Sequence, residues 1–91
     1  MKMASVFIPA LMRKLTGGRD RVTATGRTIG QIIDSLESQF PGIRAQLIDG
    51  GDLKSSLAVS INGEMATGGL LEPVDDTSDI YLVPALSGGG L

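Results

Sequence analysis

The sequence predicts an α+β fold in which one sheet is crossed by one main helix. Five short runs alternate between apolar and polar residues or are rich in β-branched residues, which is typical of strands. One longer stretch repeats its apolar residues at the 3.6-residue period of a helix. The order strand, strand, helix, strand, strand, strand favours two layers, because a helix laid across a sheet buries both apolar surfaces. A chain of 91 residues is expected to form a single domain.

The first two strands are predicted near the start of the chain. The run Val6-Phe7-Ile8 is β-branched and aromatic and Pro9 closes it, so we expect a strand over residues 2–8. Residues 21–25 alternate polar and apolar side chains, which predicts a half-buried second strand. Thr16-Gly17-Gly18 lies between the two runs. We therefore expect a hairpin whose loop is longer than the tight two-residue type.

Residues 28–40 carry the clearest helical signal in the chain. Thr28 precedes the first apolar residue and Gln31 follows three positions later, which is the capping-box pattern that satisfies the first free amides of a helix. Pro41-Gly42 ends the helix, because proline cannot continue it. Residues 43–48 are compatible with one further helical turn. Five residues share the predicted buried face: Ile29, Ile32, Ile33, Leu36 and Phe40.

The second half of the chain predicts three further strands. Residues 57–61 form an apolar, β-branched run, and the Asn62-Gly63 that follows prefers the left-handed conformations of a type I′ turn. Residues 64–66 are therefore expected to return as a short strand. Residues 79–83 predict the last strand, and residues 49–52 predict a loop. The strand residues expected to face the helix are Val6, Ile8, Val22, Val59, Ile61, Ile80 and Leu82.

The composition argues against several classes of function. The chain has no His, no Cys and no Trp, which removes the commonest general base and nearly every zinc site. We therefore expect a protein that is not an enzyme, has no metal site and is located in the reducing cytoplasm. One Tyr, two Phe and a net charge of −2 argue against a nucleic-acid partner. No apolar run approaches the roughly 20 residues of a membrane span.

The charges are segregated along the chain. Six of the eight basic residues precede residue 28, and nine of the ten acidic residues follow it. One interpretation is an ordinary solvated surface. The other is a polarised docking surface for a protein partner, because opposed potentials steer association and select partners. On the second interpretation the docking residues are Arg13 and Lys14, together with Pro84 and Leu86 after the last strand.

The chain ends in a glycine-rich segment, Ser87-Gly88-Gly89-Gly90-Leu91. It offers nothing to pack, so we expect residues 1–86 to form the body and residues 87–91 a flexible tail. The plain interpretation is a mobile chain end. The alternative is a tethered carboxylate presented to the active site of another protein. Glycines can thread a narrow channel, and five extended residues reach roughly 17 Å beyond the body.

A set of short motifs follows in order along nearly the whole chain. They are residues 8–13 (Ile-Pro-Ala-Leu-Met-Arg), Thr16-Gly17-Gly18, Thr28-Ile29-Gly30, Phe40-Pro41-Gly42-Ile43, Asn62-Gly63, Gly68-Gly69-Leu70 and residues 75–89. The ordered set with a terminal Gly-Gly resembles the sulfur carriers related to the thiamin carrier and to the small subunit of molybdopterin synthase. These are ubiquitin-like β-grasp proteins, which implies a mixed sheet crossed by the helix. Within the group the chain is most similar to the carrier of thiocarboxylate-dependent cysteine synthesis.

The resemblance implies chemistry at the end of the chain. A ubiquitin-activating-type enzyme would adenylate the terminal glycine with ATP, and the adenylate would become a thiocarboxylate. This group would donate sulfur to an acceptor, either a cysteine-synthase-like enzyme or the large subunit of molybdopterin synthase. No tightly bound cofactor is implied. The implied reactive residue is Gly89, with Gly90 as the alternative, in a tail made of Ser87, Gly88, Gly89 and Gly90.

The chain departs from the family at two places, and three further functions stay open. The family ends at Gly-Gly, whereas Gly90-Leu91 follow here, so a C-terminal peptidase is expected to remove two residues, or one if Gly90 reacts. Asp76 stands where the family often has Gly. The alternatives are the small subunit of molybdopterin synthase and, from another class, a ubiquitin-like modifier joined to lysines by isopeptide bonds. A plain β-grasp interaction module is a third possibility.

Overall fold

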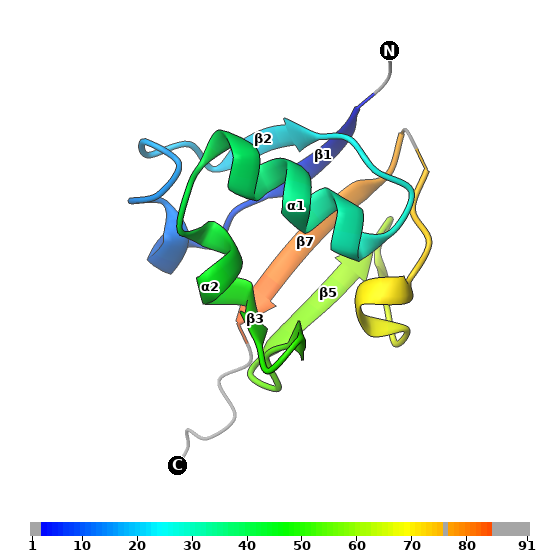
Figure 1. The fold of residues 1–91 in the computed structure, drawn as a ribbon. Helices are drawn as coiled ribbons and strands as arrows, with labels where there is room; N and C mark the ends of the chain where they lie inside the picture. Colours follow the sequence, from blue (N-terminus) through cyan, green and yellow to red (C-terminus); the bar gives the residue numbers. More distant parts are fainter. Residues whose placement is uncertain (1–2, 76, 85–91) are drawn as a thin grey trace.

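The central sheet contains five strands: β1 Ala4–Phe7, β2 Arg21–Ala24, β5 Leu57–Ile61, β6 Glu64–Met65 and β7 Asp79–Pro84. The computed structural model describes residues 3–75 and 77–84. The strand order is β2-β1-β7-β5-β6 (Figure 1). β1 and β7 run parallel, and the other neighbours run antiparallel. The mixed sheet that the resemblance implies is therefore confirmed, and β7 lies at its centre.

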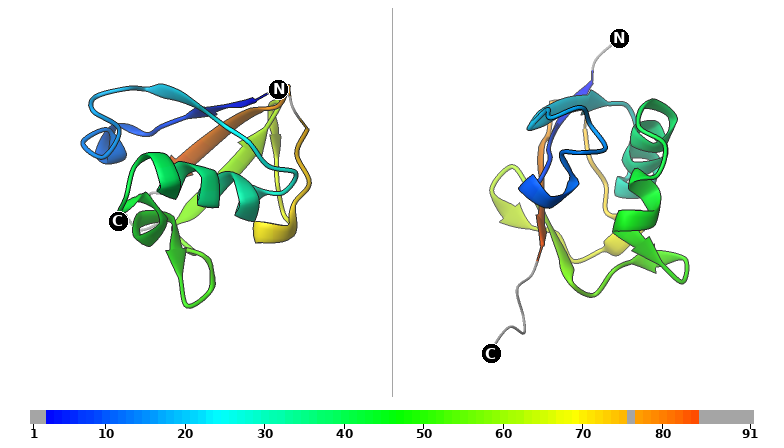
Figure 2. Two further views of the ribbon diagram at one scale, coloured as in Figure 1. Left: turned by 45° about the horizontal axis from the view of Figure 1, so that its top comes forward. Right: turned by 90° about the vertical axis from the view of Figure 1, so that its left-hand side faces the viewer.

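One main helix, α1 (Ile29–Gln39), lies across one face of this sheet, which gives the two-layer β-grasp arrangement (Figure 2). Thr28 caps the helix as predicted, because its Oγ1 accepts a hydrogen bond from the Gln31 amide at 3.2 Å. The Gln31 side chain accepts from the Arg27 amide at 2.8 Å, one residue earlier than a strict capping box requires. The smaller elements are η1 Ala10–Met12, α2 Ile43–Leu47, β3 Ile48–Asp49, β4 Asp52–Leu53 and η2 Gly69–Leu71.

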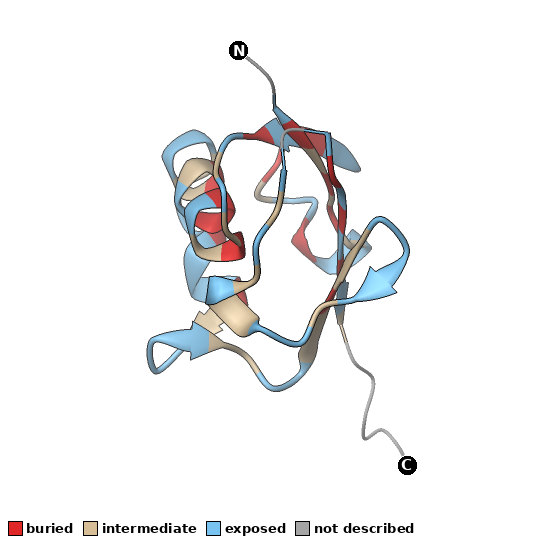
Figure 3. Cartoon of the chain, turned by 90° about the vertical axis from the view of Figure 1, so that its right-hand side faces the viewer, coloured by how far each residue is buried: buried red, intermediate tan, exposed pale blue. Residues whose placement is uncertain are grey.

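The core lies between α1 and the sheet (Figure 3). Four of the five predicted helix residues are buried, whereas Phe40 at the end of the helix is only half-buried and packs against the core. The predicted strand residues are also buried except Ile61, which is half-buried. The short helix α2 adds Ile43 and Leu47, both fully buried. Burying an aliphatic side chain contributes about 1.5–3 kcal/mol, so this layer supplies most of the stability.

Two predictions about local structure need correction. Residues 49–52 were expected as a loop, but Asp49 and Asp52 pair across a two-stranded hairpin. Gly50 and Gly51 have φ of 65° and 87°, so a two-residue turn in the left-handed region replaces the longer loop. The first strand is described from Ala4 and ends at Phe7, although the Ile8 amide still bonds to the Asp20 carbonyl at 2.8 Å.

The other turns and strands follow the prediction closely. Asn62 and Gly63 have φ of 53° and 86°, which is the type I′ geometry expected between β5 and β6. The last strand extends one residue further than predicted, to Pro84, which pairs with Leu57. The predicted boundary between body and tail, after residue 86, lies outside the described residues. Over the described ranges, no helix has the length and apolar character that a membrane crossing requires.

Candidate docking surface at the root of the C-terminal segment

The end of β7 is the root of the C-terminal segment. β7 lies between β1 and β5, and hydrogen bonds on both sides hold it in the sheet. Its first residue is fixed as well, because the Asp79 amide donates to Asn62 Oδ1 at 2.9 Å. Pro84 closes the strand and is half-buried. The predicted site residues that follow it lie outside the described residues: Leu86, Ser87, Gly88, Gly89 and Gly90.

The loop of residues 10–20, called here the basic loop, carries Arg13 and Lys14, and both side chains are exposed. It begins with the 3-10 turn η1 after Pro9, which has no N–H to donate to the sheet. Arg13 is anchored by its Nε, which donates to the Ile8 carbonyl at 3.2 Å. The remaining N–H groups of the Arg13 guanidinium can donate hydrogen bonds to a partner.

Thr16 holds the basic loop in shape. It is one of two buried polar residues in the described chain, with 1% of its surface exposed. Its hydroxyl lies 2.8 Å from the Arg19 carbonyl and 3.2 Å from the Arg13 carbonyl, and it can donate to either. Gly17 and Gly18 follow with φ of 68° and 88°, values that non-glycine residues rarely adopt. The predicted Thr-Gly-Gly turn therefore has a structural role, which is to present the basic side chains.

A groove of about 270 Å³ joins the basic loop to β7. Arg13 and Asp20 line it from the loop, and Tyr81 and Leu82 line it from β7. The structure thus brings the predicted docking residue Arg13 to the strand that bears the C-terminal segment. Lys14 and Pro84 do not line this groove.

The sequence also led us to expect the exposed face of the sheet to take part in docking, and this face carries an apolar surface whose residues were not among the predicted docking residues. The Phe7 and Tyr81 rings stack, with centroids 4.2 Å apart and an interplanar angle of 5°. Tyr81 and Val83 are 42% and 44% exposed, and Met65 on β6 is 63% exposed. The alternation of the last strand could have revealed these residues, because residues 79, 81 and 83 must face away from the buried Ile80 and Leu82. Large exposed apolar side chains on one face mark an interaction surface.

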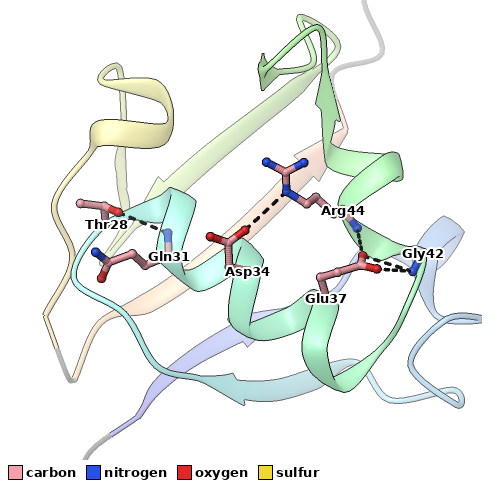
Figure 4. Close-up of polar contacts among 6 residues, drawn as sticks. All are labelled: Thr28, Gln31, Asp34, Glu37, Gly42 and Arg44. Carbon is pink, nitrogen blue, oxygen red and sulfur yellow. Dashed lines mark hydrogen bonds and ion pairs between the residues drawn. The ribbon is translucent and has the colours of Figure 1, made fainter.

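Among the described residues, two carboxyl groups, Glu37 and Asp75, have lowered pKa values, and both accept hydrogen bonds within turns (Figure 4 shows Glu37). The pKa of Glu37 falls because its carboxylate accepts hydrogen bonds from the Arg44 and Gly42 amides. The pKa of Asp75 falls because it accepts from the Thr77 amide and from the Thr77 and Ser78 hydroxyls. Asp75 thereby shapes the turn that leads into β7.

The arrangement of the described residues suits recognition by a partner. No group of three or more His, Cys, Asp or Glu side chains in the described part of the chain could hold a metal ion. The two groups with shifted pKa values serve turns, and Asp75 is exposed while Glu37 is half-buried. The described residues do form a continuous surface, which consists of the stacked Phe7 and Tyr81 rings, the groove beside Arg13 and the end of β7.

The chain is similar to several known proteins. It is 34% identical over 90 residues to the sulfur carrier protein CysO of Mycobacterium tuberculosis, covering 93% of this chain and 97% of the relative. It is 30% identical over 64 residues to small archaeal modifier protein 3 of Haloferax volcanii, covering 68% of this chain and 70% of the relative. The crystal structure of the Amycolatopsis orientalis BexX/CysO complex matches with a TM-score of 0.88 and 38% identity, covering 94% and 99% of the two chains. The family model of the ThiS family matches residues 6–89, and the chain therefore belongs to the ThiS family.

Proposed function

We propose that the protein is a sulfur carrier that acts through the carboxylate of Gly89. The observation that carries the proposal is the family match, which spans the body and ends at Gly89, five residues after the root at Pro84. Support also comes from the CysO relative, whose name describes a sulfur carrier protein. With two C-terminal residues beyond Gly89, a peptidase step would precede the chemistry, and Gly90 is the reactive end if only Leu91 is removed.

The proposed chemistry has two steps, both supplied by a ubiquitin-activating-type enzyme. The Gly89 carboxylate oxygen attacks the α-phosphate of ATP, and pyrophosphate leaves. Sulfide then attacks the carbonyl carbon of the adenylate, and AMP leaves with the original oxygen, so the chain end becomes a thiocarboxylate. The acceptor is a cysteine-synthase-like enzyme in the cytoplasm; the large subunit of molybdopterin synthase is the alternative acceptor.

The body would serve as the recognition element for these enzymes. The groove and the open sheet face lie next to the root, so a partner that binds them also holds the entering chain end. Arg13 and Lys14 would supply the charge that steers this encounter. Exposed aromatic side chains such as Tyr81 are frequent anchors of protein interfaces.

The test uses a chain that ends at Gly89 and the cognate activating enzyme with ATP and sulfide. We expect its intact mass to rise by one oxygen-to-sulfur exchange, because the carboxylate of a side-chain-free tail can lie in line with the α-phosphate. Gly89→Leu should abolish the exchange without unfolding the body. Ser55→Leu, which places the same side chain at an exposed turn, is the control and should react normally. Thiocarboxylate formation by Gly89→Leu at the normal rate would refute the proposal.

A protein-modifier function is the second candidate, and the similarity to small archaeal modifier protein 3 favours it. The same adenylate would then be attacked by a lysine amine of a target protein, with loss of AMP. Peptide mapping separates the two candidates. A carrier yields the thiocarboxylate and a small-molecule product, whereas a modifier leaves C-terminal remnants of this chain on lysines of other proteins.

A further inference from the structure

A second groove lies between the β3–β4 turn and η2. Its volume is about 440 Å³, and it is lined by Gly51, Asp52 and residues 67–71. Gly68 and Gly69 form one wall without side chains. A Cβ at Gly69 would lie 3.3 Å from Asp52 Oδ1, so glycine allows the two segments to approach this closely. We call this hollow the acidic groove.

The acidic groove combines an exposed apolar side chain with negative charge. Leu71 on its rim is 82% exposed, the highest value among the large apolar residues of the described chain. Asp52 is the one acidic residue that lines the groove, and Asp49 stands directly opposite it on β3. Such a like-charge pair destabilises a hairpin unless a cation relieves it. The ion pair found among the described residues joins Asp34 to Arg44, so neither Asp49 nor Asp52 is paired with a described cation. The groove therefore suits an apolar residue flanked by Lys or Arg.

The basic loop has this chemistry. Leu11 at its start is 80% exposed, and Arg13 and Lys14 follow within three residues. Arg19 adds a further exposed cation. In Figure 1 the loop is blue at the left, whereas the groove lies between η2, yellow at the right, and the green β3–β4 hairpin at the bottom. One copy therefore cannot bring its own loop to its own groove.

We propose that the acidic groove binds the basic loop of a second copy of this chain. Leu11 packs against Leu71, and Arg13 and Lys14 face the carboxylates of Asp49 and Asp52. The contact joins two different surfaces, so it is head-to-tail and each bound pair keeps one free loop and one free groove. Because the same loop is the proposed docking surface for the enzymes, self-association removes carrier from their reach and falls as the protein is diluted.

The proposal is tested by sedimentation equilibrium of the full chain, with no enzyme present, so its failure leaves the carrier function untouched. We expect the average mass to rise with concentration in about 0.02 M salt and to return to that of the monomer in about 0.5 M salt, where screening is strong. Leu71→Ser and Lys14→Glu should each weaken self-association about tenfold. Both side chains are exposed, so neither change should affect folding.

Mixing the two variants gives the sharper result. Leu71→Ser keeps an intact loop and Lys14→Glu keeps an intact groove, so together they should form a 1:1 dimer that cannot extend. Val83→Ser on the open sheet face is the matched control and should self-associate like the unchanged chain. A chain that stays monomeric in low salt, a mixture that forms no dimer, or a loss confined to Val83→Ser would each overturn the proposal.

Discussion

Glu37 connects the two helices through a single carboxylate. Its oxygens accept hydrogen bonds from the Gly42 amide at 3.0 Å and the Arg44 amide at 2.9 Å. These are free N–H groups at the start of α2, whose N-cap Gly42 has no capping side chain of its own. Arg44 also forms an ion pair with Asp34, at 3.4 Å, but both side chains are largely exposed, so that pair contributes little. At the residue scale, Glu37 therefore matters more than the ion pair beside it.

The lowered pKa of Glu37 predicts how stability depends on pH. The group is ionised above its folded-state pKa, which lies below the ordinary value of 4.5, so its contribution is complete near neutral pH and is lost as the pH falls through that folded-state value. Glu37→Gln should be less stable than the unchanged chain at pH 7, and the difference should shrink as the pH drops below 4.5. Urea unfolding across this range measures it. Glu64→Gln, which removes an exposed carboxylate from β6, is the control, and a difference independent of pH would contradict the assignment.

The helix α1 was predictable in detail because its signals are local. The apolar period, the cap at Thr28 and the stop at Pro41-Gly42 all lie within fifteen successive residues, from 28 to 42, and the structure confirms each. The hairpin of β3 and β4 was missed for the opposite reason. Two-residue strands are too short to show an alternation, and only the pairing of Asp49 with Asp52 reveals them.

The burial of α1 leads to a stability prediction at the same scale. Ile33 and Leu36 are both 0% exposed and face the sheet. Replacing either with Ala should lower the free energy of unfolding by roughly 2–4 kcal/mol, through lost burial and the cavity left behind. Denaturant unfolding measures this, and Ser38→Ala on the exposed side of α1 is the control. A loss below about 0.5 kcal/mol at both buried positions would contradict the two-layer arrangement.

The candidate site shows the same division between local and long-range information. The Thr-Gly-Gly turn and the basic residues beside it could be predicted from neighbours in the sequence. The stacking of Phe7 on Tyr81 could not, because it depends on the parallel register of β1 and β7, which are separated by most of the chain. The strand order follows from contacts between distant segments and has no local signature.

At the scale of the whole molecule, the separation of charge in the sequence becomes a separation in space. The basic loop lies toward the carboxyl end of β7, whereas the acidic residues Glu72, Asp75 and Asp79 belong to the segment that leads into the opposite end of this strand (Figure 1). Such an asymmetric field orients the protein as it approaches a charged partner and raises the rate of productive encounters. The placement of the basic end beside the root of the C-terminal segment suits a partner that must receive that segment.

Reversal of both charges on the basic loop tests this orientation. Arg13→Glu with Lys14→Glu should lower the association rate with the activating enzyme by about tenfold in low salt and flatten its salt dependence. The matched control reverses two cations outside the basic loop, Arg27→Glu with Lys54→Glu, and changes the net charge by the same amount. Stopped-flow binding measures both. Unchanged rates in the first variant would place the docking surface elsewhere, with the acidic residues 72–79 as the next surface to test.

The central position of β7 has a mechanical consequence. A pull applied to the chain at Pro84 acts along the axis of a strand that is bonded to β1 on one side and to β5 on the other. Hydrogen bonds between strands lie across this axis, so the load is shared among them in shear and they do not open one after another from a free edge. If a partner pulls on the chain beyond Pro84, the body would therefore resist as a rigid anchor.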